Sequence, residues 1–180
     1  MEDTLFLKKE WVIFKHWVHY RQFLGRTVSH PLLCRLPWWR PEREPEPYAI
    51  ERFEGNVVLN DGITVLCDLI AATEGGTSGL FDEANAELGV GDDDTAAAAT
   101  QDDLQAATNV AWIAMDTGYP QRSNQTIIWQ ATAGTSIANY AWKEFGLRNG
   151  DAVLFNRKVD SRGTKDSSMS WTVQLKITLA

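Results

Sequence analysis

The end of the chain alternates strictly between apolar and polar side chains. From Ser170 to Leu179 the sequence reads SWTVQLKITL. A period of two over ten residues is typical of a β-strand with one face in a core and the other in solvent. We therefore expect the apolar members of this strand to lie in the protein core. They are Trp171, Val173, Leu175, Ile177 and Leu179.

Residues 48–180 contain further short strand-like runs, separated by turn signals rich in Gly, Asn and Pro. Strands joined in this way are typical of an antiparallel sandwich or barrel. The sequence therefore predicts a mainly β body, an antiparallel β-sandwich or barrel with one packed helix. The other expected strands are Ala49–Phe53, Glu87–Gly91, Ala111–Asp116, Thr126–Ala133, Tyr140–Leu147 and Ala152–Val159.

The packed helix is expected at Ile63–Ala71, after the capping sequence Asn60-Asp61-Gly62. Helical spacing gathers four residues on its buried face. They are Ile63, Leu66, Cys67 and Ile70. Because a chain of this size needs no disulfide, both of its cysteines are expected to be buried thiols.

The first 47 residues differ from the body in composition. Residues 5–24 place apolar side chains three and four positions apart, which predicts a helix with a very wide apolar face. Five of the six prolines lie between positions 31 and 47, and Pro-rich segments act as extended spacers. We therefore expect a helical N-terminal arm at 1–36, a Pro-rich tether at 37–47 and the β-rich body at 48–180.

The net charge of −7 is unevenly distributed. Residues 1–50 hold eight Lys or Arg against six Asp or Glu, whereas residues 51–180 hold nine against eighteen. An acidic body argues against nucleic acid as a partner. No apolar run reaches the ~18 residues of a membrane span, so no membrane contact is expected. A basic, aromatic arm suits an acidic partner surface, although solvated cations would explain the same charges.

Catalytic and metal-binding patterns are weak. No His lies within residues 51–180, so a Ser-His or Cys-His pair cannot form there. His16 and His19 fit no strong zinc template. The run Asp92–Asp94 lacks the spacing of a calcium loop, and a solvated turn explains it more simply, with Ca²⁺ as the alternative. We expect no enzyme activity, no cofactor and no metal.

The body also carries a series of distinctive short sequence phrases. They are EGNVVLNDGI at 54–63, LGVGD at 88–92, TAAAATQDDL at 95–104, WKEFGLRN at 142–149, LFNRKV at 154–159, and GTK followed by WTV between 163 and 173. This series resembles a small β module of tailed-bacteriophage virion proteins. That module occurs in fibre and collar-type proteins and in head-associated decoration proteins.

The resemblance implies a structural component of a phage virion, assembled in the host cytoplasm. Its partners would be other virion proteins of the capsid or tail, and the protein itself would be a homo-oligomer, a trimer. The short chain favours a capsid decoration protein; the alternative is a tail-associated fibre or tail-tip receptor-binding module.

The arm is the expected attachment element, because so apolar a helix should not remain exposed. The other outcome is that it completes the core of the body. The expected partner-binding residues are Trp11, Phe14, Trp17, Tyr20, Trp38 and Trp39.

Overall fold

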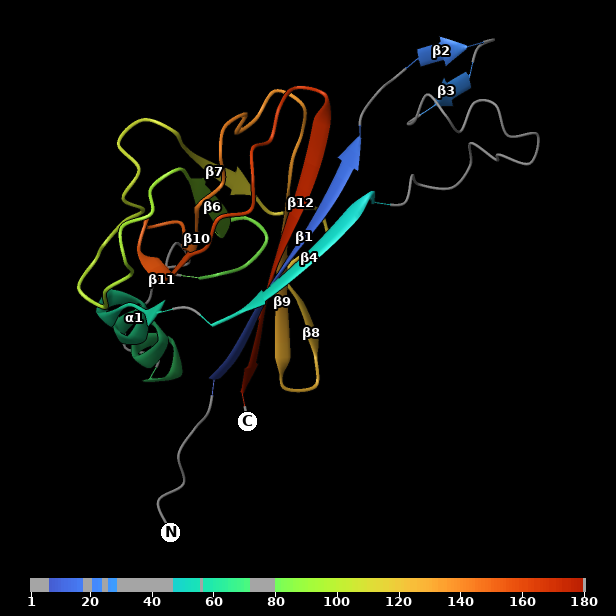
Figure 1. The fold of residues 1–180 in the computed structure, drawn as a ribbon. Coiled ribbons are helices and arrows are strands. Elements are labelled where there is room, and N and C mark those ends of the chain that lie inside the picture. Colours follow the sequence, from blue (N-terminus) through green and yellow to red (C-terminus); the bar gives the residue numbers. More distant parts are fainter. Residues whose placement is uncertain are drawn as a thin grey trace.

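The protein is a β-sandwich of two five-stranded antiparallel sheets, which Figure 1 shows packed face to face. The computed structural model describes residues 7–17, 21–23, 26–28, 47–55, 57–71 and 80–179. The mainly β architecture expected from the sequence is confirmed.

The first sheet has the strand order β4-β1-β12-β9-β8. Its central strand is β12, which pairs with β1 from Leu7 opposite Leu179 to Trp17 opposite Met169. The N-terminal and C-terminal strands are therefore neighbours. The members are β1 (Leu7–Trp17), β4 (Ala49–Glu54), β8 (Gln121–Ser123), β9 (Thr126–Ala133) and β12 (Met169–Leu179).

The second sheet has the strand order β5-β11-β10-β6-β7. Its members are β5 (Val57–Val58), β6 (Glu87–Gly91), β7 (Val110–Ala114), β10 (Glu144–Arg148) and β11 (Leu154–Val159). Two further strands, β2 (Arg21–Phe23) and β3 (Arg26–Val28), pair with each other.

The N-terminal segment is a strand and not the helical arm expected from the sequence. Leu7–Trp17 is strand β1, held between β4 and β12, so this part of the chain belongs to the body. The apolar run from Trp11 to Phe14 is aromatic and β-branched, which suits an interior strand. The wide apolar face predicted for a helix is thus explained by a strand with apolar residues on both sides. Of the rest of the expected helix, Arg21–Phe23 form strand β2, and residues 5, 6, 18–20 and 24 lie outside the described residues.

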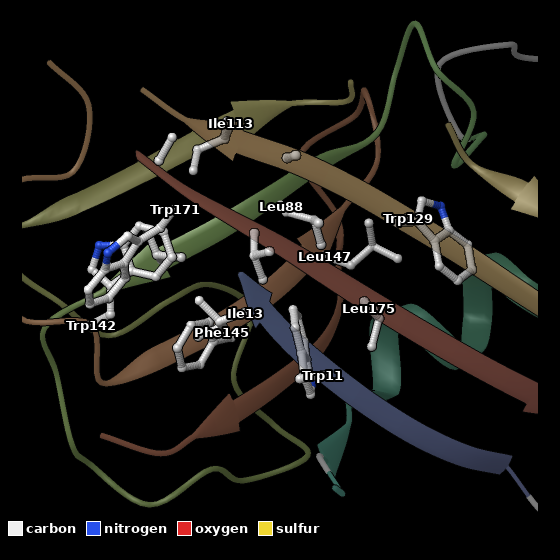
Figure 2. Close-up of a cluster of buried hydrophobic side chains, with 14 of the residues drawn as sticks. Trp11, Ile13, Leu88, Ile113, Trp129, Trp142, Phe145, Leu147, Trp171 and Leu175 are labelled. Atoms are coloured by element: carbon white, nitrogen blue, oxygen red, sulfur yellow. The ribbon is translucent and has the colours of Figure 1, made fainter. Parts of the chain in front are cut away.

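The core fills the space between the sheets with large aromatic side chains (Figure 2). Trp11 stacks on Phe53 at a centroid distance of 6.2 Å and contacts Phe145 at 5.7 Å. Trp142 and Trp171 meet edge to face at 4.9 Å, an arrangement favoured by the ring quadrupoles. Residues distant in sequence are therefore joined in one cluster.

Four of the five C-terminal residues expected in the core lie between the sheets. The exposed fractions of Trp171, Val173, Leu175 and Ile177 are 1%, 0%, 0% and 4%. Leu179 is instead 40% exposed. It is the last residue of β12, where the sandwich no longer covers the strand.

Helix α1 (Asn60–Ala71) packs against β11, and the buried face expected from its sequence is confirmed at Leu66 but not at Ile63 or Cys67. A Cβ added to Gly62 would lie 2.4 Å from the Phe155 carbonyl oxygen, so the helix lies directly on the strand backbone. Leu66 packs on the core, whereas Ile63 is 47% exposed and the Cys67 thiol is free and exposed rather than buried. Close approach at Gly62 rotates the helix so that Ile63 faces solvent.

Two glycines of β6 make room for side chains on the outer surface of the second sheet. Their spacing fits no nucleotide-binding loop. A Cβ on Gly89 would lie 2.4 Å from the Trp112 ring, and a Cβ on Gly91 would lie 2.3 Å from a Glu144 carboxylate oxygen. The glycines are therefore required by packing.

Candidate functional site

The expected partner-binding residues do not form one surface. Trp11 has an exposed fraction of 0% and belongs to the core, because its strand is interior; this corrects its assignment to an attachment surface. Phe14 is half-buried and lies opposite Thr172 of β12 and Ile50 of β4. Trp17 is the last residue of β1. The other three candidates, Tyr20, Trp38 and Trp39, lie outside the described residues.

The segment between β1 and β4 is joined to the body at both of its ends, and is not a free arm joined at one end. Lys15 of β1 lies opposite Ala49 of β4, and the Tyr48 N–H donates to the Lys15 carbonyl at 2.9 Å. Because paired strands are about 5 Å apart, residues 18–46 leave and return at one end of the sandwich. We call residues 18–46 the β1–β4 connection. The tether expected at 37–47 therefore lies within a connection between two strands of one sheet.

The β1–β4 connection has the opposite charge to the rest of the chain. Residues 18–46 contain five Arg and three Glu, a net charge of +2. The total of −7 then leaves −9 for all other residues. The basic character assigned to the first 50 residues is thus concentrated in this connection.

A small polar cluster closes the end of the sandwich from which the connection departs. The Lys15 ammonium donates to Glu51 Oε1 and to the Arg162 carbonyl, both at 2.6 Å, and lies 4.2 Å from the centre of the Trp171 ring. Arg162 lies over the Phe53 ring at 4.0 Å. Cation–π contacts of this kind are strengthened when desolvated. The base of the connection is therefore firmly held.

A buried ion pair forms the strongest polar site of the described structure. Arg157 and Glu144 are both fully buried on the second sheet, with 2.7 Å between Arg157 Nε and Glu144 Oε2. The Glu144 carboxylate also accepts the N–H groups of Gln105 and Ala106 at 2.9 and 2.8 Å. Residues 92–109, the loop between β6 and β7, are thereby attached to the sheet.

Arg157 binds the first half of the same loop. Its Nη1 donates to the Thr95 carbonyl at 2.8 Å and to Gln101 Oε1 at 3.1 Å, and its Nη2 lies 3.3 Å from Asp93 Oδ1. A buried guanidinium with partners in a fixed fork geometry orders the groups around it. This site therefore organises a loop and presents no reacting group to a substrate.

The three residues of the run Asp92–Asp94, considered for Ca²⁺, each contact a different partner. Asp92 accepts from the Asn109 side-chain amide at 2.7 Å, Asp93 faces Arg157, and Asp94 lies 3.3 Å from the Lys143 ammonium. In the part of the chain that the structure describes, no three His, Cys, Asp or Glu residues converge as metal ligands.

Acidification is expected to weaken the hold of Asp93 on this loop. Hydrogen bonds from Thr95, with a lesser contribution from Arg157, lower the pKa of Asp93 below its ordinary value of 3.8. A carboxylate with a lowered pKa stabilises the fold above pH 3.8, and this stability is lost as the pH falls through the folded-state pKa. Asp93→Asn should therefore flatten the decline of the urea midpoint between about pH 5 and pH 2.

Asp94→Asn is the matched control, because Asp94 is 78% exposed and an exposed ion pair contributes little. It should retain the parent pH profile. A parent-like profile for Asp93→Asn would contradict the assignment.

Two acidic residues of the body, Asp116 and Glu144, have separate structural roles. Asp116 accepts hydrogen bonds from Gln130 and Thr132 on β9 at 2.9 and 2.8 Å, whereas Glu144 is bound to Arg157 on the second sheet.

No helix in the described part of the chain is long and apolar enough to cross a membrane.

Comparison with known proteins found no match among protein-family models, curated proteins or solved structures.

Sequence reasoning missed the buried Glu144–Arg157 pair. One signal was present. Glu144 begins the stretch EFGL, and the three residues that follow it suit a buried strand. A charged residue in such a stretch is seldom fully buried without a partner. Nothing in the sequence identified Arg157 as that partner, because the two lie on different strands.

Proposed function

We propose that the chain is a non-enzymatic structural protein of a tailed-phage virion, that it decorates the capsid, and that the β1–β4 connection attaches it. One observation carries this proposal. The β1–β4 connection begins and ends at the same end of an acidic sandwich, and that end is closed and firmly held. The sequence phrases of the body support the virion setting, since they resemble those of phage decoration and fibre modules.

The composition of the connection suits a protein surface as its partner. It carries Tyr20, Trp38 and Trp39 together with four Arg residues between 18 and 41. Trp, Tyr and Arg are enriched among the residues that dominate binding energy at interfaces. Positive charge steers association with an acidic surface and sets register. We therefore expect an acidic capsid surface to bind this element.

The expected attachment element was a free arm at residues 1–36. The proposed one is the β1–β4 connection, residues 18–46. Trp11 is committed to the core and Phe14 is half-buried in β1. Attachment is therefore assigned to the residues between the two strands. Homo-oligomerisation remains part of the proposal, and the resemblance indicates a trimer. The alternative function, a tail-associated fibre or tail-tip adaptor, would use the same element on a tail component.

The test removes the connection and keeps the strands. The last paired residues before the connection are Lys15 and Ala49, so a short loop can join the two strands. An Asn-Gly turn inserted between residues 17 and 47 provides such a loop. We expect the chain with 18–46 replaced by Asn-Gly to fold and to lose binding to particles assembled without the protein.

Two further variants make the result decisive. Leu69→Ala on the exposed side of α1 should bind as the parent does. Trp38→Ala combined with Trp39→Ala, in the full chain, should weaken binding at least tenfold. Retained binding by the folded Asn-Gly chain or by the double tryptophan variant would overturn the proposal. Electron microscopy of decorated particles separates capsid from tail attachment.

A further inference from the structure

The second sheet ends in a strand edge that the described part of the chain leaves uncovered. We propose that this edge, β7, pairs with β7 of a second copy to form a two-fold dimer. Among the described residues, Val110–Ala114 have backbone hydrogen bonds to β6 alone. Val110 is 39% exposed, and Ala114 is also exposed. Unpaired N–H and C=O groups along such an edge are a template for another strand.

The other three edges of the two five-stranded sheets carry the features that prevent pairing. Strand β4 has three charged side chains in six residues, and β8 is three residues long with Arg122 at its centre. Strand β5 has two residues and is soon followed by α1. Short length, charge and a neighbouring helix are the usual protections of an edge. Strand β7, with the sequence VAWIA, has five residues, no charge and no proline.

Charge favours a second copy as the occupant. Residues 104–115 contain no Asp, Glu, Lys or Arg, although the chain as a whole has a net charge of −7. Two acidic copies repel each other over most of their surfaces, and the repulsion is least where a neutral stretch meets its equivalent. A neutral edge on an acidic protein is therefore suited to self-association.

The sequence of β7 is also compatible with its own antiparallel copy. Pairing about Trp112 sets Val110 against Ala114 and Ala111 against Ile113, so every cross-strand pair is apolar. Like-charged pairs, which destabilise a sheet, are absent from this register. A surface that is its own complement closes as a two-fold dimer. The geometry of this edge therefore favours a dimer over the trimer implied by the sequence resemblance.

Trp112 keeps the edge ordered before pairing. Its ring lies on Gly89 of β6, and the Arg148 guanidinium lies 4.2 Å from the ring centre on the neighbouring surface. Arg148 is itself held by Glu87, with 2.6 Å between Nη2 and Oε2. A strand fixed in this way loses little conformational entropy when a second strand adds to it.

The test introduces charges at the two exposed ends of β7. In the proposed register, Val110→Lys with Ala114→Lys opposes Lys to Lys, and Val110→Glu with Ala114→Glu opposes Glu to Glu. Like charges directly opposite destabilise pairing, so each double variant should dimerise at least about tenfold more weakly than the parent. An equimolar mixture should restore the dimer, because Lys then faces Glu.

Sedimentation and light scattering provide the readout at about 100 µM, since an edge contact is a small interface. The parent should have twice the 20.2 kDa mass of one chain. Ile50→Lys, at a 50% exposed position of β4, is the matched control and should remain dimeric. A monomeric or trimeric parent, a dimer of the Lys variant alone, or a mixture that stays monomeric would overturn the proposal.

Discussion

Replacing Glu144 by Gln is expected to lower the free energy of unfolding by about 3–5 kcal/mol, the usual loss when one partner of a buried ion pair is removed. Arg157 would retain its charge at 0% exposure without its nearest carboxylate. The amide nitrogen of Gln would also face one of the two backbone N–H groups that donate to the Glu144 carboxylate. Equilibrium urea denaturation measures the loss, and proteolysis of residues 92–109 reports release of the loop.

Two controls separate the buried pair from charge in general. Glu87→Gln removes a carboxylate from a pair whose side chains are 33% and 24% exposed, so it should cost less than about 1 kcal/mol. Arg157→Met added to Glu144→Gln should recover much of the stability, because no uncompensated charge remains buried. A loss for Glu144→Gln no larger than that for Glu87→Gln would contradict the role of the pair.

Trp171→Ala is expected to destabilise the protein by about 3–5 kcal/mol, because it leaves a cavity at the centre of the core. Trp171 is 1% exposed, meets Trp142 at 4.9 Å and supports the Lys15 ammonium at 4.2 Å. The substitution removes three kinds of interaction: apolar burial, an aromatic pair and a cation–π contact. Urea denaturation of the two chains measures the difference.

Leu179→Ala is the matched control on the same strand, where the side chain is already 40% exposed. It should cost clearly less, since little apolar area returns to water. A loss below about 1 kcal/mol for Trp171→Ala would mean that the core face of β12 had been assigned wrongly.

Alternation was the most informative sequence signal, because it depends on local geometry alone. The strand at the end of the chain, β12, follows directly from it, with the exception of Leu179 at its end. Expected strands such as Thr126–Ala133 and Glu87–Gly91 have the bounds that the structure shows. Their boundaries are marked by Gly, Asn and Pro, whose backbone preferences act locally.

The N-terminal strand could not be recognised in the same way. Trp11, Val12, Ile13 and Phe14 are consecutive apolar residues, and such a run fits a buried strand or one side of a wide helix. Pairing with β12, more than 150 residues away, decides between them. Contacts at that separation leave no local pattern in the sequence.

The buried pair was hidden for a similar reason. Glu144 and Arg157 are brought together by the register of β10 on β11, which sets Gly146 opposite Arg157. The strands were expected, but their register was not. A shift of one residue between the two strands would place the two side chains on opposite faces of the sheet. The candidate attachment residues were separated for the same reason, because Trp11 became core once β1 joined the sheet.

Hydrogen exchange of β1 tests most directly the central claim that the N-terminal aromatic segment is an interior strand and not an attachment arm. Amides of an interior strand exchange only when the sheet opens. We predict that residues 9–16 are protected as strongly as residues 171–177 of β12. Exchange of residues 9–16 at the rate of an unprotected chain, while β12 stays protected, would contradict the account.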